Sequence, residues 1–240
     1  MREALLECTI SLSYFPDSRI ISGEMSGKPR NDWDSPYILE WFLLCIFKTE
    51  QVERFLKAAR PGTFADPDML LVGQTTCSSI SRANGMHCGP ITPTQEQTQM
   101  AMWAIFAAPL MMSNDLPSVS AHARALLTNA ECLRINQDPL ARQGRRVVYE
   151  GGEWPQPSLQ VWARELEGTD IAVALYNFNH APATITLRFS DVGYSPSTAV
   201  RMLDVFGNGK VSNSSVHAGT WQSPLLSANE TVLLRLLLAD

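Results

Sequence analysis

Carboxylates in two short segments are the side chains with the clearest potential for chemistry. Asp34 ends the segment Arg30-Asn31-Asp32-Trp33-Asp34, and Asp66 and Asp68 flank a proline in Asp66-Pro67-Asp68-Met69. A carboxyl group can transfer a proton or attack as a nucleophile. Both segments also have structural interpretations. Asp66-Pro67-Asp68 is typical of a turn in which Asp accepts a hydrogen bond from a backbone amide. Asp34 can begin a helix, where the helix dipole favours a negative charge.

The cysteines and histidines do not form a metal-binding pattern. The chain has five cysteines and no Cys-x-x-Cys pair, which argues against zinc. His87 stands beside Cys88, but no third candidate ligand is close to them in the sequence. We therefore expect no metal ion and no cofactor. Cys77 and Cys88 bracket a polar loop that a disulfide could close in an oxidising compartment.

The composition is typical of a globular protein with one large domain or two of ordinary size. The chain has 240 residues, of which 45% are hydrophobic and 18% charged, with a net charge of −5. Only four residues are lysine, so we expect no nucleic-acid partner. The longest apolar stretches, residues 38–47 and 100–112, are shorter than the ~20 residues of a membrane span. Residues 1–7 are charged and unlike a signal peptide.

Residues 92–108 carry the strongest helix signal. Thr92 can cap the amino end, Pro93 suits the first helical position, and Gln95 stands where a capping box places an acceptor. Apolar residues then recur at a spacing of three and four, which predicts one broad apolar face. Pro109 is expected to end this helix. A second helix is predicted at residues 120–127.

Short apolar runs between the helices predict a parallel sheet. Leu110-Met111-Met112 is predicted as a buried strand, followed by Ser113-Asn114-Asp115. Residues 70–73 fit either an edge of the sheet or a loop that leaves it. Alternating helices and strands are typical of βα units, and in barrels built from such units the catalytic groups cluster at the carboxyl ends of the strands.

The hydrophobic period changes to two after Val147. Ile171, Val173 and Leu175 alternate with the residues between them, as do Ile185, Leu187 and Phe189. Residues 207–209 read Gly-Asn-Gly, a signal for a tight turn, and residues 230–238 form a final apolar strand. Several strands separated by frequent turns predict an antiparallel sandwich.

Three segments, in this order, resemble glycoside hydrolase family 27, the α-galactosidases and α-N-acetylgalactosaminidases also called melibiases. The segments are Asp66 to Leu70, Gln99 to Leu116, and Ile135 to Gly144. The resemblance implies a catalytic (β/α)₈ barrel followed by an antiparallel β domain. For this chain we therefore predict the C-terminal half of a barrel at residues 1–146 and an antiparallel β-sandwich at residues 147–240.

The resemblance also implies a retaining mechanism with two carboxylates about 5 Å apart. The family's nucleophile is the Asp of a Lys-x-Asp motif, and no lysine of this chain is followed two residues later by Asp. The family's Asp-Asp-Gly-Trp segment is also missing from the sequence. The expectation is that the chain corresponds to the part of the enzyme that follows the nucleophile.

The family's acid/base lies in an Arg-Asn-x-x-Asp pattern, which Arg30 to Asp34 match. On this alignment Asp34 is the catalytic acid/base and Arg30 orients the substrate. A second alignment places Asp34 at the start of the helix that follows the acid/base, and both stay open. Asp68 and Met69 are implied to bind the sugar, whereas a turn role is favoured for Asp66. For four further polar residues of the matching segments, backbone capping is favoured over catalysis: Asn114, Asp115, Asn136 and Asp138.

The implied enzyme is a glycosidase that removes terminal α-linked galactose or N-acetylgalactosamine from a glycan. The choice between the two sugars stays open, because residues 9–28 depart from the family's substrate-selecting loop. A non-catalytic remnant that binds a glycan or a partner is the alternative. The resemblance further implies a lysosomal or secreted location and a possible homodimer of the full-length protein. Two glycosylation sequons, at Asn213 and Asn229, permit the secretory route.

Overall fold

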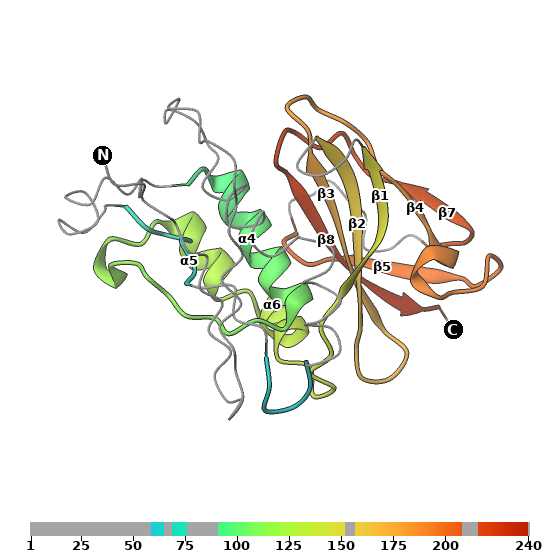
Figure 1. Ribbon diagram of the computed structural model, residues 1–240, viewed down its shortest axis with the longest axis horizontal. Coiled ribbons are helices and arrows are strands. Elements are labelled where there is room, and N and C mark those ends of the chain that lie inside the picture. The colour runs from blue at the N-terminus through green and yellow to red at the C-terminus, as the bar shows by residue number, and fades with distance from the viewer. Residues whose placement is uncertain (1–58, 65–68, 76–90, 152–156, 208–215, 240) are drawn as a thin grey trace, which may run out of the picture.

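The computed structural model describes residues 59–64, 69–75, 91–151, 157–207 and 216–239. Three layers are evident in Figure 1: a group of helices, a large sheet beside them, and a small sheet on the far side. The helical elements are α4 (Pro93–Phe106), η1 (Leu116–Ser118), α5 (Ala121–Leu127) and α6 (Ala130–Asn136). The large sheet has six strands and the small sheet has two.

Helix α4 begins as the sequence predicts. The Thr92 side chain accepts from the Gln95 amide, and the Gln95 side chain accepts from the Thr92 amide. The end differs from the expectation, because the last helical residue is Phe106 and Ala107 adopts a left-handed conformation with φ of 53°. The prediction of a single apolar face was wrong. All residues from Thr98 to Ala108 are buried, since α4 lies between the large sheet and the other helices.

Two strand segments before and after α4 pair in parallel. Leu70 and Met112 form a parallel bridge, which confirms the parallel pairing and shows that Leu70 itself lies in a strand contact. The prediction that residues 110–112 are buried was wrong, because Met111 is 56% exposed and Met112 is 46% exposed. Leu70 and Leu110 pack against α4, but no described element covers the two methionines.

The two short helices that follow have side-chain caps. Ser120 accepts from the Ala123 amide at the start of α5, which confirms the predicted helix. Helix α6 was not predicted from sequence. Asn129 caps it by accepting from the Cys132 amide, and Cys132 and Ile135 are its buried residues. A helix this short gives little periodic signal, so its packing decides it.

The large sheet is entirely antiparallel. Its order is β1-β2-β3-β8-β5-β6, and the small sheet pairs β4 with β7. The strands are β1 (Arg145–Gly151), β2 (Ser158–Glu165), β3 (Ile171–Phe178), β4 (Thr186–Arg188), β5 (Val200–Asp204), β6 (Val216–His217), β7 (Thr220–Gln222) and β8 (Thr231–Leu238), with η2 (Phe189–Val192) after β4. The predicted fold class, a partial barrel followed by an antiparallel sandwich, is confirmed. The division at residues 146 and 147 stays a prediction.

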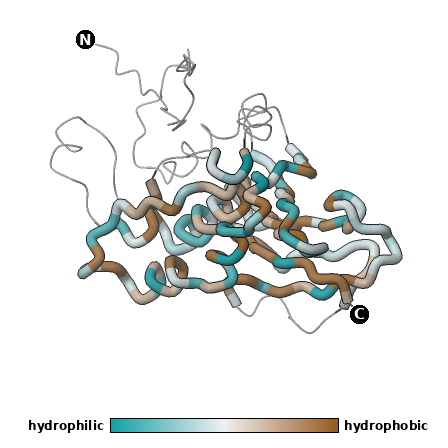
Figure 2. Tube along the Cα trace, turned by 90° about the horizontal axis from the view of Figure 1, so that it is seen from below, coloured by the Kyte–Doolittle hydropathy of each residue, from teal (hydrophilic) through white to brown (hydrophobic). Residues whose placement is uncertain are grey.

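The large sheet contributes to two separate cores. On β3, Ile171, Val173 and Leu175 face the small sheet, whereas Ala172 and Ala174 face the helices. This follows from the pleat of a strand, which directs successive side chains to opposite faces. Figure 2 shows apolar and polar stretches following one another along the chain. Within the described residues, no helix is long and apolar enough to cross a membrane.

Candidate functional site at the end of the parallel strand pair

Three of the four predicted site residues, Arg30, Asp34 and Asp68, lie outside the described residues. Asp66 and the Cys77–Cys88 pair lie outside them as well. The fourth predicted site residue, Met69, immediately precedes the parallel bridge and is 41% exposed. The roles of all four residues stay predictions. The described part of the candidate site is therefore the end of the strand pair beside Met69.

The two segments pair through an isolated parallel bridge. The Leu70 amide donates to the Met111 carbonyl at 2.7 Å, and the Ser113 amide donates back to the Leu70 carbonyl at 3.2 Å. The Ser113 hydroxyl adds a bond to the same carbonyl at 2.6 Å. The chain then turns, because the Gln74 amide donates to the Leu71 carbonyl at 3.0 Å. Gly73 has a φ of +77° in this turn, a conformation that glycine adopts at little cost.

Polar side chains hold this turn from two sides. From α4, Gln99 Oε1 accepts from the Leu71 amide at 2.8 Å, and Glu96 Oε1 accepts from the Gly73 amide at 2.7 Å. From the neighbouring segment, Asn114 Nδ2 donates to the Val72 carbonyl at 2.8 Å. The second carboxylate oxygen of Glu96 lies 3.7 Å from His122 Nε2 of α5. The backbone of the turn is thus fixed by side chains rather than by a strand.

The favoured capping roles of Asn136 and Asp138 are confirmed. Asn136 Nδ2 donates to the carbonyls of Trp103 and Ala108, at the end of α4. Asp138 accepts from the backbone amides of Leu140 and Glu167. The Asp115 side chain accepts from the Ser118 hydroxyl at 3.0 Å and makes no side-chain cap bond to the backbone of η1, so backbone capping is not shown for Asp115.

The described residues contain no group of three or more histidine, cysteine, aspartate or glutamate side chains able to hold a metal ion. Cys132 is a free, buried thiol whose sulfur lies 3.7 Å from the Met100 carbonyl. Burial raises the pKa of this thiol to about 12. A neutral thiol is a poor nucleophile, so Cys132 serves as a small core residue.

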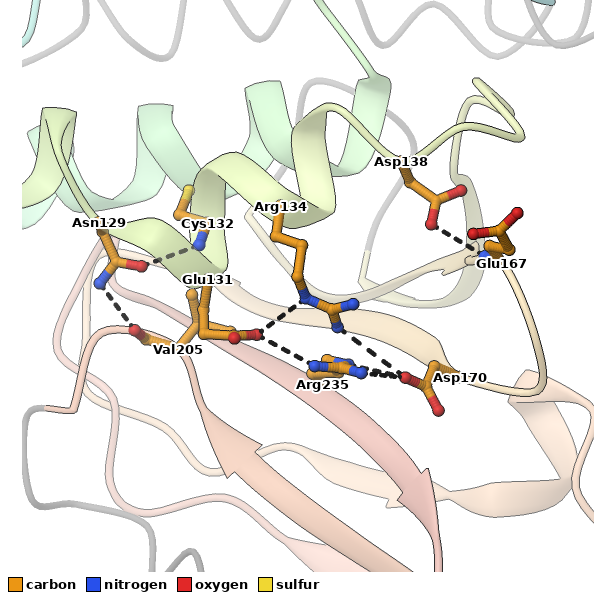
Figure 3. Close-up of polar contacts among 9 residues, drawn as sticks. All are labelled: Asn129, Glu131, Cys132, Arg134, Asp138, Glu167, Asp170, Val205 and Arg235. Carbon is orange, nitrogen blue, oxygen red and sulfur yellow. Dashed lines mark hydrogen bonds and ion pairs between the residues drawn. The ribbon is translucent and has the colours of Figure 1, made fainter.

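A second polar cluster joins α6 to the sandwich, as Figure 3 shows. Arg235 of β8 binds Asp170 through Nε and Nη2, and its Nη1 lies 3.2 Å from Glu131 of α6. Arg134 lies 3.4 Å from Glu131 and 3.9 Å from Asp170. Burial raises the pKa of Asp170, Arg134 opposes the rise, and Glu131 adds to it. Each of the four charges faces an opposite charge, so the cluster fits a structural role better than a ligand site.

Arg164 is a buried charge that the sequence did not reveal. It points from β2 toward the helices, where Nη1 donates to the carbonyls of Ala104 and Asn136 near the ends of α4 and α6. Only 1% of the residue is exposed, and burial lowers the pKa of its guanidinium to about 10. A cation at helix carboxyl ends is stabilised by the helix dipoles. The signal in the sequence was weak: Ser158, Gln160 and Arg164 share one face of a strand with Trp162.

The sequon at Asn229 is not accessible in the folded chain. Asn229 is 9% exposed and has a φ of 59°. Its carbonyl accepts from Thr98 Oγ1 at 2.7 Å, and its Oδ1 accepts from the Tyr176 hydroxyl at 3.3 Å. These contacts are part of the junction between α4 and the sandwich. Burial leaves little room for a glycan on the Asn229 side chain in this fold.

Comparison with known families identifies two consecutive matches. Residues 30–138 match the family model described as alpha galactosidase A. Residues 156–236 match the model of the alpha galactosidase C-terminal beta sandwich domain. The first match contains the strand pair and α4, and the second contains most of the sandwich.

Curated relatives agree with these matches. Alpha-galactosidase 2 of Arabidopsis thaliana is 31% identical over 185 residues, which cover 77% of this chain and 39% of the relative. Alpha-galactosidase A of Homo sapiens is 38% identical over 143 residues, covering 59% of this chain and 29% of the relative. Alpha-N-acetylgalactosaminidase of Gallus gallus is 33% identical over 184 residues, covering 76% of this chain and 39% of the relative. The chain thus spans 29–39% of the length of these relatives.

Solved structures agree as well. A putative alpha-galactosidase/melibiase of Bacteroides fragilis is 26% identical, with a TM-score of 0.66 over 82% of this chain and 38% of that chain. A putative alpha-N-acetylgalactosaminidase of Bacillus halodurans is 25% identical, with a TM-score of 0.66 over 86% of this chain and 45% of that chain. A β-L-arabinopyranosidase of Geobacillus stearothermophilus shares the fold at 23% identity, with a TM-score of 0.68 over 83% of this chain and 43% of that chain.

Proposed function

The chain belongs to glycoside hydrolase family 27 over its two matched regions, and from this premise we propose that it is part of a glycosidase of the α-galactosidase type. The proposed reaction is hydrolysis of terminal α-linked galactose or N-acetylgalactosamine. The full-length protein would use a retaining mechanism with two carboxylates. The relatives include enzymes named for each of the two sugars, so the choice between them stays open.

In this proposal Asp34 is the acid/base that protonates the leaving oxygen, and Arg30 orients the sugar. Asp68 and Met69 bind the sugar beside the acid/base. The nucleophile motif Lys-x-Asp does not occur in the 240 residues, so the mechanism requires a second carboxylate that this sequence does not supply. A lysosomal or secreted location and homodimerisation of the full-length enzyme are further proposals, which cell fractionation and gel filtration test.

The observation that carries the proposal is the parallel bridge between Leu70 and Met112. Parallel pairing on either side of a helix is the arrangement of neighbouring strands in a βα unit, and barrels of such units assemble their active sites at the carboxyl ends of the strands. Met69 stands directly before this bridge and is 41% exposed. The turn that follows is held by hydrogen bonds from the buried side chains of Glu96 and Gln99, and a sugar-binding pocket requires such rigid support.

Sugar binding and turnover test the proposal separately. Titration calorimetry with galactose and with N-acetylgalactosamine is expected to show binding of one sugar by the 240-residue chain, with glucose as the control. Asp68→Asn and Met69→Ala should each weaken that binding, by about five- to tenfold for the loss of one contact. Failure of the chain to bind either sugar would contradict the proposal.

Turnover distinguishes the enzyme from the non-catalytic alternative. We expect no hydrolysis of nitrophenyl α-galactoside by the 240-residue chain, because no residue occupies the nucleophile motif. Sequencing the transcript upstream of the first codon then decides between the two. In-frame Lys-x-Asp and Asp-Asp-Gly-Trp motifs would support the enzyme, and Asp34→Asn in that longer protein should remove its activity. A reading frame without them would favour a protein that only binds glycan or a partner.

A further inference from the structure

One turn of α4 forms hydrogen bonds to two different parts of the molecule. Glu96 and Gln99 bind the backbone of the turn after Met69, across 23 and 28 residues of sequence. The two residues between them bind the sandwich. Gln97 Nε2 donates to the Thr231 carbonyl at 2.9 Å, and Thr98 Oγ1 donates to the Asn229 carbonyl at 2.7 Å. Residues 96–99 therefore connect the sandwich to the strand end that carries Met69.

Burial makes the contacts of Glu96 and Gln99 costly to lose, above all the contact of Glu96 with the buried Gly73 amide. Glu96 is 7% exposed, Gln99 is fully buried, and the turn residue Gly73 is buried as well. A buried backbone amide that loses its acceptor has no water to replace it, so the turn would have to move. Gly73 has little room to move, because a Cβ added there would lie 3.2 Å from Ala123 Cβ and 3.3 Å from Val119 Cγ1.

The helix that supplies these acceptors is itself firmly placed. Its amino end is closed by the capping box of Thr92 and Gln95 one residue before Glu96. Its next turns are buried between the large sheet and the helices α5 and α6. An acceptor on such a helix has a fixed position relative to the sandwich. The acceptor therefore also fixes the backbone that it binds, including the residues next to Met69, relative to the sandwich.

We propose that Glu96 and Gln99 are positioning residues of the sugar site. They do not touch the sugar. They hold the amides of Gly73 and Leu71, and so they set where Met69 stands at the end of its strand. This role rests on the proposed function, because it is defined by the sugar that Met69 contacts. It also gives a reason for the burial of a carboxylate and a carboxamide in the first half of α4.

Substitutions that differ only in the acceptor test this role. Glu96→Met and Gln99→Met keep a similar length and remove the acceptor, whereas Glu96→Gln keeps an acceptor for the Gly73 amide. Gln97→Met is the matched control, since it removes a bond from the same helical turn but leaves both acceptors in place. All four variants are made in the full 240-residue chain.

Two measurements are made on each variant: amide hydrogen exchange of Leu71 and Gly73, and the affinity for galactose and N-acetylgalactosamine by calorimetry. For Glu96→Met and Gln99→Met we expect about tenfold faster exchange of the released amide and about fivefold weaker binding of the preferred sugar. Glu96→Gln should restore both values to within about twofold, and Gln97→Met should lower the melting temperature while leaving both values near wild type.

The outcomes separate the two proposals. Faster exchange with unchanged sugar affinity would show that the contacts are only structural, and it would overturn the positioning role while leaving the proposed function intact. Equal effects of Gln97→Met and Gln99→Met on affinity would also overturn it, because general destabilisation would then explain the loss. A wild-type chain that binds neither sugar would overturn the proposed function and the positioning role together.

Discussion

The two faces of the six-stranded sheet are stabilised in different ways. The face toward the small sheet is mainly apolar, with a core of valine, leucine, isoleucine, methionine, alanine and phenylalanine, and Asn177 is a buried polar residue at its edge. The face toward the helices also buries Trp162 and Tyr176, but polar groups lie among them, including Gln160 and Arg164. Apolar burial is non-directional and tolerates some repacking, whereas buried polar groups require particular partners. The first face therefore contributes stability, and the second also fixes how the helices sit on the sheet.

The largest expected effect comes from removing the helices. Residues 145–240 alone would expose the helix-facing side chains of the sheet, among them Trp162, Tyr176 and Phe178. Leaving a few hundred Å² of apolar surface in water costs about 25 cal/mol per Å², against a net domain stability of about 5–15 kcal/mol. We expect this fragment to aggregate in gel filtration, unlike the full chain. A monodisperse fragment that melts at the temperature of the full chain would mean that the apolar face alone suffices.

The next effect concerns the buried charge of the helix-facing side. Arg164→Ala leaves a cavity and frees the carbonyls of Ala104 and Asn136, so we expect a loss of about 3 kcal/mol in urea unfolding. Arg164→Met fills most of the space and removes a costly buried charge, so its loss should be about 1 kcal/mol. The same two substitutions at Arg188, which is exposed on β4, serve as the control. Equal losses for the two Arg164 variants would show that the charge matters more than the volume.

A smaller effect should appear at alkaline pH. The pKa of Cys132 is raised from 9.0 to about 12 by burial, so above pH 9 the unfolded chain loses this proton while the folded chain keeps it. Folded stability should then fall as pH rises, by about 1.4 kcal/mol per pH unit once the unfolded thiol is fully ionised. The difference between wild type and Cys132→Ala, measured by urea unfolding at pH 8 and pH 10, isolates this group. A difference that does not change with pH would contradict the prediction.

The smallest effect is expected from the ion pairs that join α6 to the sandwich. Glu131 is about one third exposed, and water weakens such pairs. A double-mutant cycle of Glu131→Gln and Arg235→Met should give a coupling of about 0.5–1 kcal/mol, which falls at high salt. Arg134→Met is the comparison, because Arg134 lies farther from both acids. A coupling near zero would leave the hydrogen bonds of α4 as the main polar contribution to the junction.

The sequence alone determined the parts of the molecule that depend on local patterns. The capping box at Thr92 and Gln95 predicted where α4 begins, and the alternation around Val173 predicted β3. The order of three motifs identified the family, and the favoured capping roles of Asn136 and Asp138 were correct. These signals lie within a few residues of one another, where helix and strand geometry relates sequence spacing directly to position.

Only the tertiary structure decided which polar residues face inward and what they bind. Glu96 and Gln99 look like exposed helix residues in the sequence, and their partners lie 23 and 28 residues away. Arg164 binds a carbonyl 60 residues away, and Asn229, a sequon in the sequence, is buried against Thr98 across 131 residues. Such contacts depend on how whole elements pack, and the hydrophobic periodicity of the sequence does not predict them. The cost of leaving a buried polar group unpaired then selects one arrangement of the packed elements.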